Sequence, residues 1–310
     1  MVTLSEDKIH RIAFAKYLLS QAKVHKSKGA PVCSFSILIL HDLVEIFLQV
    51  AKEIHVPQIE KPRGDVLETL AKALNRKMLP DGHAINLEFI NRLNQRRNAL
   101  KHSTIFVNRM DVQNLYSETE TFFIDFSKIL FDLQFDKISL VLLIMNEKIR
   151  DNLKEAELKL EIKDFDAAIV SIAKSYHYLE HTEMQISGTL GYPVFKPDYG
   201  RELYVRSRTV GSPEADSNLR WLGTEVGKDF RGLNERLADV ERIVNLGVDF
   251  KSYRKFKDLL PHIYLPSTKD TTDELHFSEP SKQLSRNIEA QDVTFCFEFV
   301  LDAALRIQSV

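Results

Sequence analysis

The sequence predicts an all-α protein. Apolar residues recur at every third or fourth position over most of the 310 residues, whereas strictly alternating runs are short and few. Only 11 Gly and 10 Pro are present, too few for a low-complexity or collagen-like chain. With 44% hydrophobic and 28% charged residues, the chain can bury one large core or two modest ones, which excludes a disordered protein.

The first helices are indicated by their start and stop signals. Ser5 precedes two acids, Glu6 and Asp7, and the helical pattern then runs to Lys28, where Gly29 follows. The segment 33–54 is apolar nearly all round, so we expect a core helix, with one polar stripe that contains Asp42, Glu45 and Gln49. Further helices are expected at 65–78, at 86–101 with Asn86 as its cap, and at 111–133 with Asp111 as its cap. Pro80-Asp81-Gly82 predicts a turn.

The second half has the same helical style. Residues 137–162 and 164–186 predict a long hairpin with its turn at Lys163-Asp164. The apolar positions of 152–183 resemble those of 17–48, a weak indication of a duplicated hairpin. Residues 187–216 are rich in Gly and Pro and predict a long loop, with a short strand near 203–205. Helices are expected at 217–245, 250–260 and 285–308, with an irregular segment at 261–284. We place the domains at 1–135 and 136–310.

Charge and cysteine content restrict the classes of partner and compartment. Lys and Arg number 42 against 44 Asp and Glu, so a polyanion must be recognised by a local patch. No stretch of about 18 uninterrupted apolar residues is present, and the N-terminus lacks the apolar run of a signal peptide. Cys33 and Cys296 lie among apolar residues and are expected to be buried, reduced thiols. These features predict a cytoplasmic protein without a membrane partner.

One short motif, Arg97-Asn98 with His102 four residues further on, carries recognisable chemistry. On the expected helix Arg97 shares a stripe with Leu93 and Leu100, where an apolar residue would be usual. A guanidinium in a packed seam is costly unless an anion or a hydrogen-bond acceptor satisfies it. Inside the chain the candidates are Asp42 and Glu45 of the core helix; outside it, a phosphate would serve.

Residues 89–110 form a local cationic stretch. They contain no Asp or Glu and five basic residues: Arg92, Arg96, Arg97, Lys101 and Arg109. A local charge of +5 in a chain of net charge −2 can attract a polyanion, although such helices are also often plain solvated faces.

The R-N-x-x-x-H motif, placed late in a helix after a hairpin with an apolar second helix, resembles the HEPN superfamily over about residues 5–134. The resemblance implies a metal-independent endoribonuclease without a cofactor, in which motifs from two paired domains form one site. His102 would be the general acid or base, Arg97 would stabilise phosphoryl charge and Asn98 would orient His102 or the phosphate. The other basic residues would bind RNA: Arg92, Arg96, Lys101 and Arg109. The products would carry a 2′,3′-cyclic phosphate.

The same resemblance leaves a second function open. Many such proteins are non-catalytic RNA- or protein-binding and assembly modules, and Ser103 and Thr104 stand where some ribonuclease members have Tyr. Arg97 and His102 lie about 140° apart on an ideal helix, so they converge only if the helix ends or bends between them, or across a two-fold axis. The implied partners are RNA, a second copy or another HEPN-like domain, and a regulatory protein; the implied role is that of a toxin or a defence or stress effector.

A further pattern, His177-x-x-Glu180-His181, matches that of inverted zinc peptidases. No third-ligand motif follows it, and the alternative interpretation is an ordinary helix flank. We therefore expect no metal site. Gly-rich phosphate-binding motifs are absent from the sequence.

Overall fold

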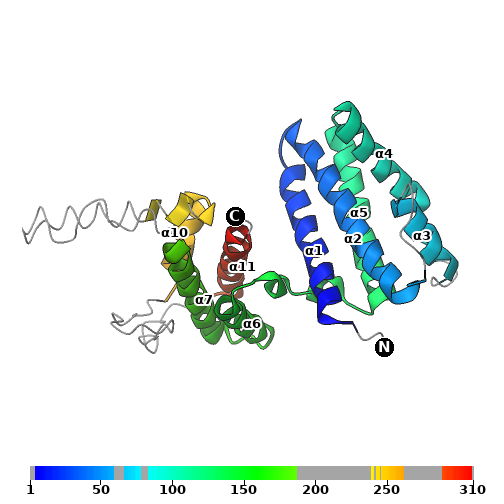
Figure 1. Cartoon of the computed structure of the whole chain (residues 1–310). Coiled ribbons are helices and arrows are strands. Elements are labelled where there is room, and N and C mark those ends of the chain that lie inside the picture. Colours follow the sequence, from blue (N-terminus) through cyan, green and yellow to red (C-terminus); the bar gives the residue numbers. More distant parts are fainter. Residues whose placement is uncertain are drawn as a thin grey trace, which may run out of the picture. The chain divides into compact units, whose positions relative to one another are not determined.

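The computed structural model describes residues 4–58, 66–77, 83–186, 239–240, 242–244, 246–261 and 288–308. For residues 181–186 it describes the backbone alone. Every regular element within these ranges is a helix, which confirms the all-α fold class. The chain divides into two compact units, 1–143 and 144–310, shown in Figure 1. The sequence placed the division at 135.

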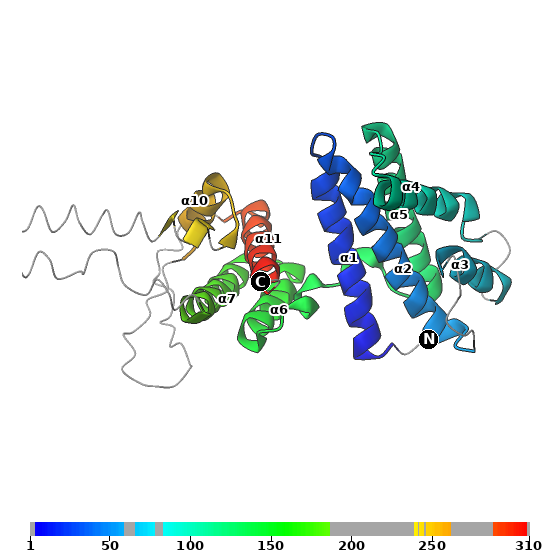
Figure 2. The same ribbon diagram turned by 45° about the horizontal axis from the view of Figure 1, so that its top comes forward.

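Unit 1 is a helical bundle. Its helices are α1 (Glu6–Lys26), α2 (Phe35–His55), α3 (Val66–Lys77), α4 (Leu87–Ser103) and α5 (Arg109–Phe131). In both ribbon views the α1–α2 connection and the α4–α5 connection lie at the same end of the bundle, opposite the N-terminus (Figures 1 and 2). Two connections that are about 75 residues apart in the sequence therefore form one end of the unit.

The helix boundaries follow from capping. Ser5 is the N-cap residue of α1, as expected, and the Asn86 side chain accepts hydrogen bonds from the backbone N–H groups of Glu88 and Phe89 at the start of α4. Helix α5 differs from the prediction, because its N-cap is Asn108 rather than Asp111. The Asn108 side chain accepts a hydrogen bond from the N–H of Asp111, so Asp111 stands in the first turn, where its charge suits the helix dipole.

Helix α2 is the core of unit 1. Phe47 is fully buried, and its ring centroid lies 4.4 Å from that of Phe123, 4.9 Å from Phe131 and 5.5 Å from Phe122. By length and composition Val32–His55 could also cross a membrane, but 56% of its apolar window is buried in the unit, as in a core helix. Cys33, at the start of this segment, is a buried free thiol, and so is Cys296 in unit 2.

The second unit begins later than the sequence suggested. Where a helix was expected from Lys137, the chain forms two 3₁₀ turns, η2 (Phe135–Lys137) and η3 (Leu140–Leu143). Helix α6 starts only at Glu147, because the side chain of Asn146 caps it by accepting hydrogen bonds from two backbone N–H groups. Periodicity alone does not distinguish a short apolar 3₁₀ segment from a helix.

Unit 2 packs the helices α6 (Glu147–Glu161), α7 (Phe165–Ile186), α10 (Phe250–Leu259) and α11 (Ala290–Ile307). The α6–α7 hairpin is present as predicted, and Lys163 makes its turn with φ 61°. Tyr176, Phe256 and Phe299 form the aromatic core; the last two rings stack at 4.2 Å. The expected features at 80–82, 187–216 and 262–284, and most of the helix expected at 217–245, lie outside the described residues.

Candidate nucleic-acid interface

Arg97 lies on α4 at a half-buried position rather than inside a packed seam. Its Nη1 donates a hydrogen bond of 2.9 Å to the side-chain oxygen of its neighbour Asn98, at an exposed site. Leu93 and Leu100 on the same stripe are buried, as expected. The expectation of a buried guanidinium was wrong because the long arginine side chain can lie along the apolar stripe while its charged end reaches solvent.

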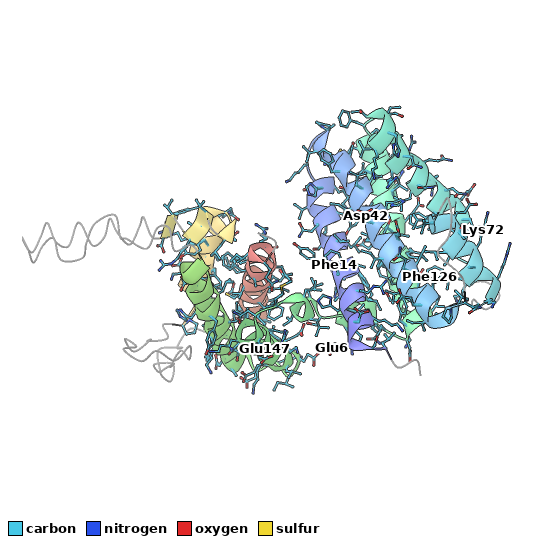
Figure 3. The ribbon with its side chains drawn as sticks, viewed as in Figure 1. Glu6, Phe14, Asp42, Lys72, Phe126 and Glu147 are labelled. Carbon is cyan, nitrogen blue, oxygen red and sulfur yellow. The ribbon has the colours of Figure 1, made fainter. Side chains whose placement is uncertain are left out.

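The two acids that the sequence offered to Arg97 have other neighbours. Glu45 accepts a hydrogen bond of 2.9 Å from Gln49, and the Asp42 carboxylate lies 3.6 Å from Nδ1 of the buried His41. Figure 3 shows Asp42 on α2. Among the residues that the structure describes, no carboxylate lies within ion-pair distance of Arg97. Its charge is therefore available to an external anion.

The cationic stretch is partly neutralised by α5, which the sequence window 89–110 did not include. Arg92 forms an ion pair with Glu118, and Arg96 forms one of 2.7 Å with Asp111. The expectation of five uncompensated charges was therefore wrong. In the described part of the chain, the members of that stretch without an ion pair are Arg97, Lys101 and Arg109.

The basic residues with an ion pair and those without one lie on different stripes of α4. Arg92 and Arg96, four residues apart, share the stripe that meets α5. Arg97 and Lys101, also four apart, form the adjacent stripe, on which Lys101 is exposed.

His102 is exposed in the last turn of α4. The helix continues from Leu87 to Ser103 and ends only at Thr104, which has φ 54°. Arg97 and His102 are therefore about 140° apart around one continuous helix, so a single chain does not bring them together. Asn98, which is four residues before His102, shares its stripe and can contact it. Convergence of Arg97 with His102 requires a second copy.

The sequence interpretation missed the chain that follows His102. Ile105, Phe106 and Met110 are large apolar side chains that remain exposed, directly beside the motif. Such exposed apolar groups are informative when they gather in one place. Burial cannot be read from a loop sequence, so no sequence signal distinguished these residues from the buried Val107 between them.

His177 and Glu180 of the H-x-x-E-H pattern on α7 belong to a largely buried polar cluster, whereas the side chain of His181 lies outside the described residues. Glu180 forms an ion pair of 2.9 Å with Arg242, and its carboxylate lies 3.4 Å from Nδ1 of His177. Burial opposes ionisation of Glu180, but the hydrogen bond from His177 and the nearby charge of Arg242 outweigh it and hold its pKa below the usual value. No group of three or more metal-ligating side chains occurs among the described residues. The contacts of Glu180 with Arg242 and His177 give these side chains a structural role.

Comparison of the chain with family models, with curated proteins and with solved structures returned no match. The HEPN resemblance consequently rests on the motif and on the order of the helices.

Proposed function

We propose that this protein is a metal-independent endoribonuclease of HEPN type that acts as a pair of identical chains. The observation that carries the proposal is the exposed end of α4, where Arg97 has no carboxylate partner among the described residues and where His102 stands free of the core. A cation available for phosphate and an accessible imidazole are the two groups that cleavage by the RNA 2′-hydroxyl needs.

The reaction uses side chains from both copies. His102 of one copy takes the proton of the 2′-hydroxyl, and the 2′-oxygen forms a bond to the adjacent phosphorus. The bond from phosphorus to the 5′-oxygen of the next nucleotide breaks, and that oxygen receives the proton back from the same His102, while the second copy supplies Arg97. Arg97 stabilises the charge on the phosphoryl oxygens, and Asn98 holds the guanidinium through their hydrogen bond. The products are a 2′,3′-cyclic phosphate and a 5′-hydroxyl.

A second candidate is a non-catalytic RNA-binding module that uses the same cations. It is favoured by the angular separation of Arg97 and His102 within one chain, because an isolated chain then has a phosphate-binding residue without an adjacent proton-transfer group. The two functions differ in whether the RNA remains intact.

A cleavage assay in EDTA distinguishes the nuclease from the binding module. We expect the full chain to cut a single-stranded RNA in EDTA and to leave a cyclic phosphate, identified by end-group analysis. His102→Ala should lower the rate about 10²- to 10⁴-fold, the usual contribution of a general acid or base. Arg76→Ala and His83→Ala are matched controls, since both residues are exposed in unit 1 outside the motif, and they should cut normally. RNA that is bound but stays intact would support the binding module and refute the nuclease.

A further inference from the structure

The end of unit 1 that carries His102 is built from two connections fastened together. The Ser34 hydroxyl donates a hydrogen bond to the Val107 carbonyl and accepts one from the Val107 N–H, both at 3.0 Å. Phe35 follows Ser34 directly and Phe106 precedes Val107 directly. Bond geometry therefore limits their Cα atoms to about 15 Å apart or less. Both side chains are exposed.

The α1–α2 side of this end is strongly cationic. No Asp or Glu occurs between Asp7 and Asp42, so the end of α1 and its connection contain lysines without acids. Lys23 and Lys28 are exposed, and Nζ of Lys26 lies 3.5 Å from the ring centroid of Tyr116 on α5. Lys101 in the last turn of α4 and Arg109 at the start of α5 add positive charge to the same end of the unit.

Exposed apolar side chains gather on the same surface. Among the described residues of unit 1, seven large apolar side chains are exposed, and two of them, Phe14 and Ile124, lie on the lengths of α1 and α5. The other five belong to the two connections or the helix turns beside them and expose between 44% and 67% of their area: Val24, Phe35, Ile105, Phe106 and Met110. A concentration of this kind marks a binding surface.

The arrangement favours a single nucleic-acid strand over a lipid surface. Exposed cations lie next in sequence to exposed apolar side chains, Lys23 beside Val24 and Arg109 beside Met110. Alternating cations and aromatic rings match alternating phosphates and bases, because every base can stack on a ring while its phosphate meets a cation. Insertion into lipid instead needs a contiguous apolar face.

We propose that this end of unit 1 is a single-stranded RNA-binding surface that extends the candidate cleavage site. Phe35 and Phe106 stack bases, and Lys23, Lys28 and Arg109 contact phosphates on either side. The inference rests on the proposed function for the identity of its ligand, but it adds residues outside the motif. It makes binding depend on several nucleotides rather than on the cleaved phosphate alone.

Binding can be measured separately from cleavage. The probe is a fluorescein-labelled 12-nucleotide RNA with 2′-O-methyl groups throughout, which lacks the attacking hydroxyl, and fluorescence polarisation is recorded with the full chain at several salt concentrations. Phe35→Ala and Phe106→Ala should each weaken binding at least fivefold. Lys23→Gln with Lys28→Gln should reduce the slope of log K against log salt by about 1.4, since each phosphate contact on a single strand contributes about 0.7.

Matched controls and rival ligands make the result decisive. Phe14→Ala and Ile124→Ala remove exposed apolar side chains elsewhere on unit 1 and should bind like the wild type. Unchanged binding of both phenylalanine variants would overturn the inference. Sedimentation of the chain with phosphatidylserine vesicles would also overturn it, if Phe35→Ala abolished this sedimentation without affecting RNA binding. The same holds for a dimer seen in light scattering that Phe35→Ala abolished while RNA binding stayed unchanged. If His102→Ala lost cleavage but still bound the RNA, the result would support the nuclease and also the separate RNA-binding surface. If the wild type bound the RNA without cutting it, only the nuclease would be refuted.

Discussion

Arg96 on α4 and Asp111 on α5 form an ion pair of 2.7 Å, one helical turn along from the pair between Arg92 and Glu118. These ion pairs join the two helices, so the stripe of α4 with Arg92 and Arg96 makes contacts within the unit. The adjacent stripe, with Arg97 and Lys101, is left for external anions. The division of cations on α4 is thus set by α5.

This division predicts unequal effects on RNA binding. Arg97→Gln with Lys101→Gln should reduce the salt slope of binding by about 1.4, because two phosphate contacts are lost. Arg92→Gln with Arg96→Gln should change it by less than about 0.7, since both guanidinium groups already meet carboxylates. Polarisation titrations of the methylated RNA provide the comparison. Equal slopes for the two double variants would show that the α5 pairs do not restrict Arg92 and Arg96.

Ser34 is expected to stabilise the junction of the two connections. Ser34→Ala removes a hydroxyl that serves both the N–H and the carbonyl of the buried Val107, so about 1–3 kcal/mol of unfolding free energy should be lost. The control is Ser27→Ala, whose hydroxyl bonds to the Val24 carbonyl at an exposed site and should change stability by less than about 0.5 kcal/mol. Urea denaturation followed by circular dichroism measures both. Equal losses would argue against a special role for Ser34.

Phe47 tests α2 as the core helix of unit 1. Phe47→Ala leaves a cavity among Phe122, Phe123 and Phe131 and should cost about 3–5 kcal/mol of stability. Phe14→Ala, at a partly exposed position, should cost much less. Denaturant midpoints report the difference. A Phe47→Ala protein as stable as the wild type would contradict the observed packing around α2.

The largely buried Glu180 should make the stability of unit 2 depend on pH. Because its pKa is lowered in the folded state, ionised Glu180 favours folding above its unfolded pKa, and this contribution is lost as pH falls through the folded pKa. Glu180→Gln should therefore destabilise the protein at pH 7 and converge toward the wild type below about pH 4. Glu155→Gln, an exposed change on α6, should show no such convergence. A stability difference that is independent of pH would refute the pairing with Arg242 and His177.

Much of the fold could be predicted from local signals. Asn86 marked a helix start because its side chain caps the next backbone N–H groups, and the apolar 33–54 segment marked the core helix. Ser5 occupies the N-cap position of α1 without a side-chain cap hydrogen bond. The segment after Lys137 was misjudged because 3₁₀ turns and helices share a short apolar pattern. Asn108 was missed as a cap because Asp111, three residues later, has an equally suitable side chain.

The candidate site was less predictable than the fold. The motif identified Arg97 and His102, but the exposure of Arg97 depends on the path of its side chain, which periodicity does not specify. The partners Glu118 and Asp111 come from another helix, and the contact of Ser34 with Val107 brings the connection that holds Phe35 beside the one that holds Phe106. Contacts of this kind arise from packing between distant segments, so a scan along one chain does not show them.

The central claim is that Arg97 of one copy acts with His102 of another, and complementation tests it most directly. Arg97→Ala and His102→Ala chains are co-expressed with different tags, and mixed pairs are purified through both tags. A mixed pair holds one intact composite site and one doubly defective site, so it should show about half of wild-type cleavage although each parent is inactive. Mixed pairs as inactive as their parents would contradict the claim.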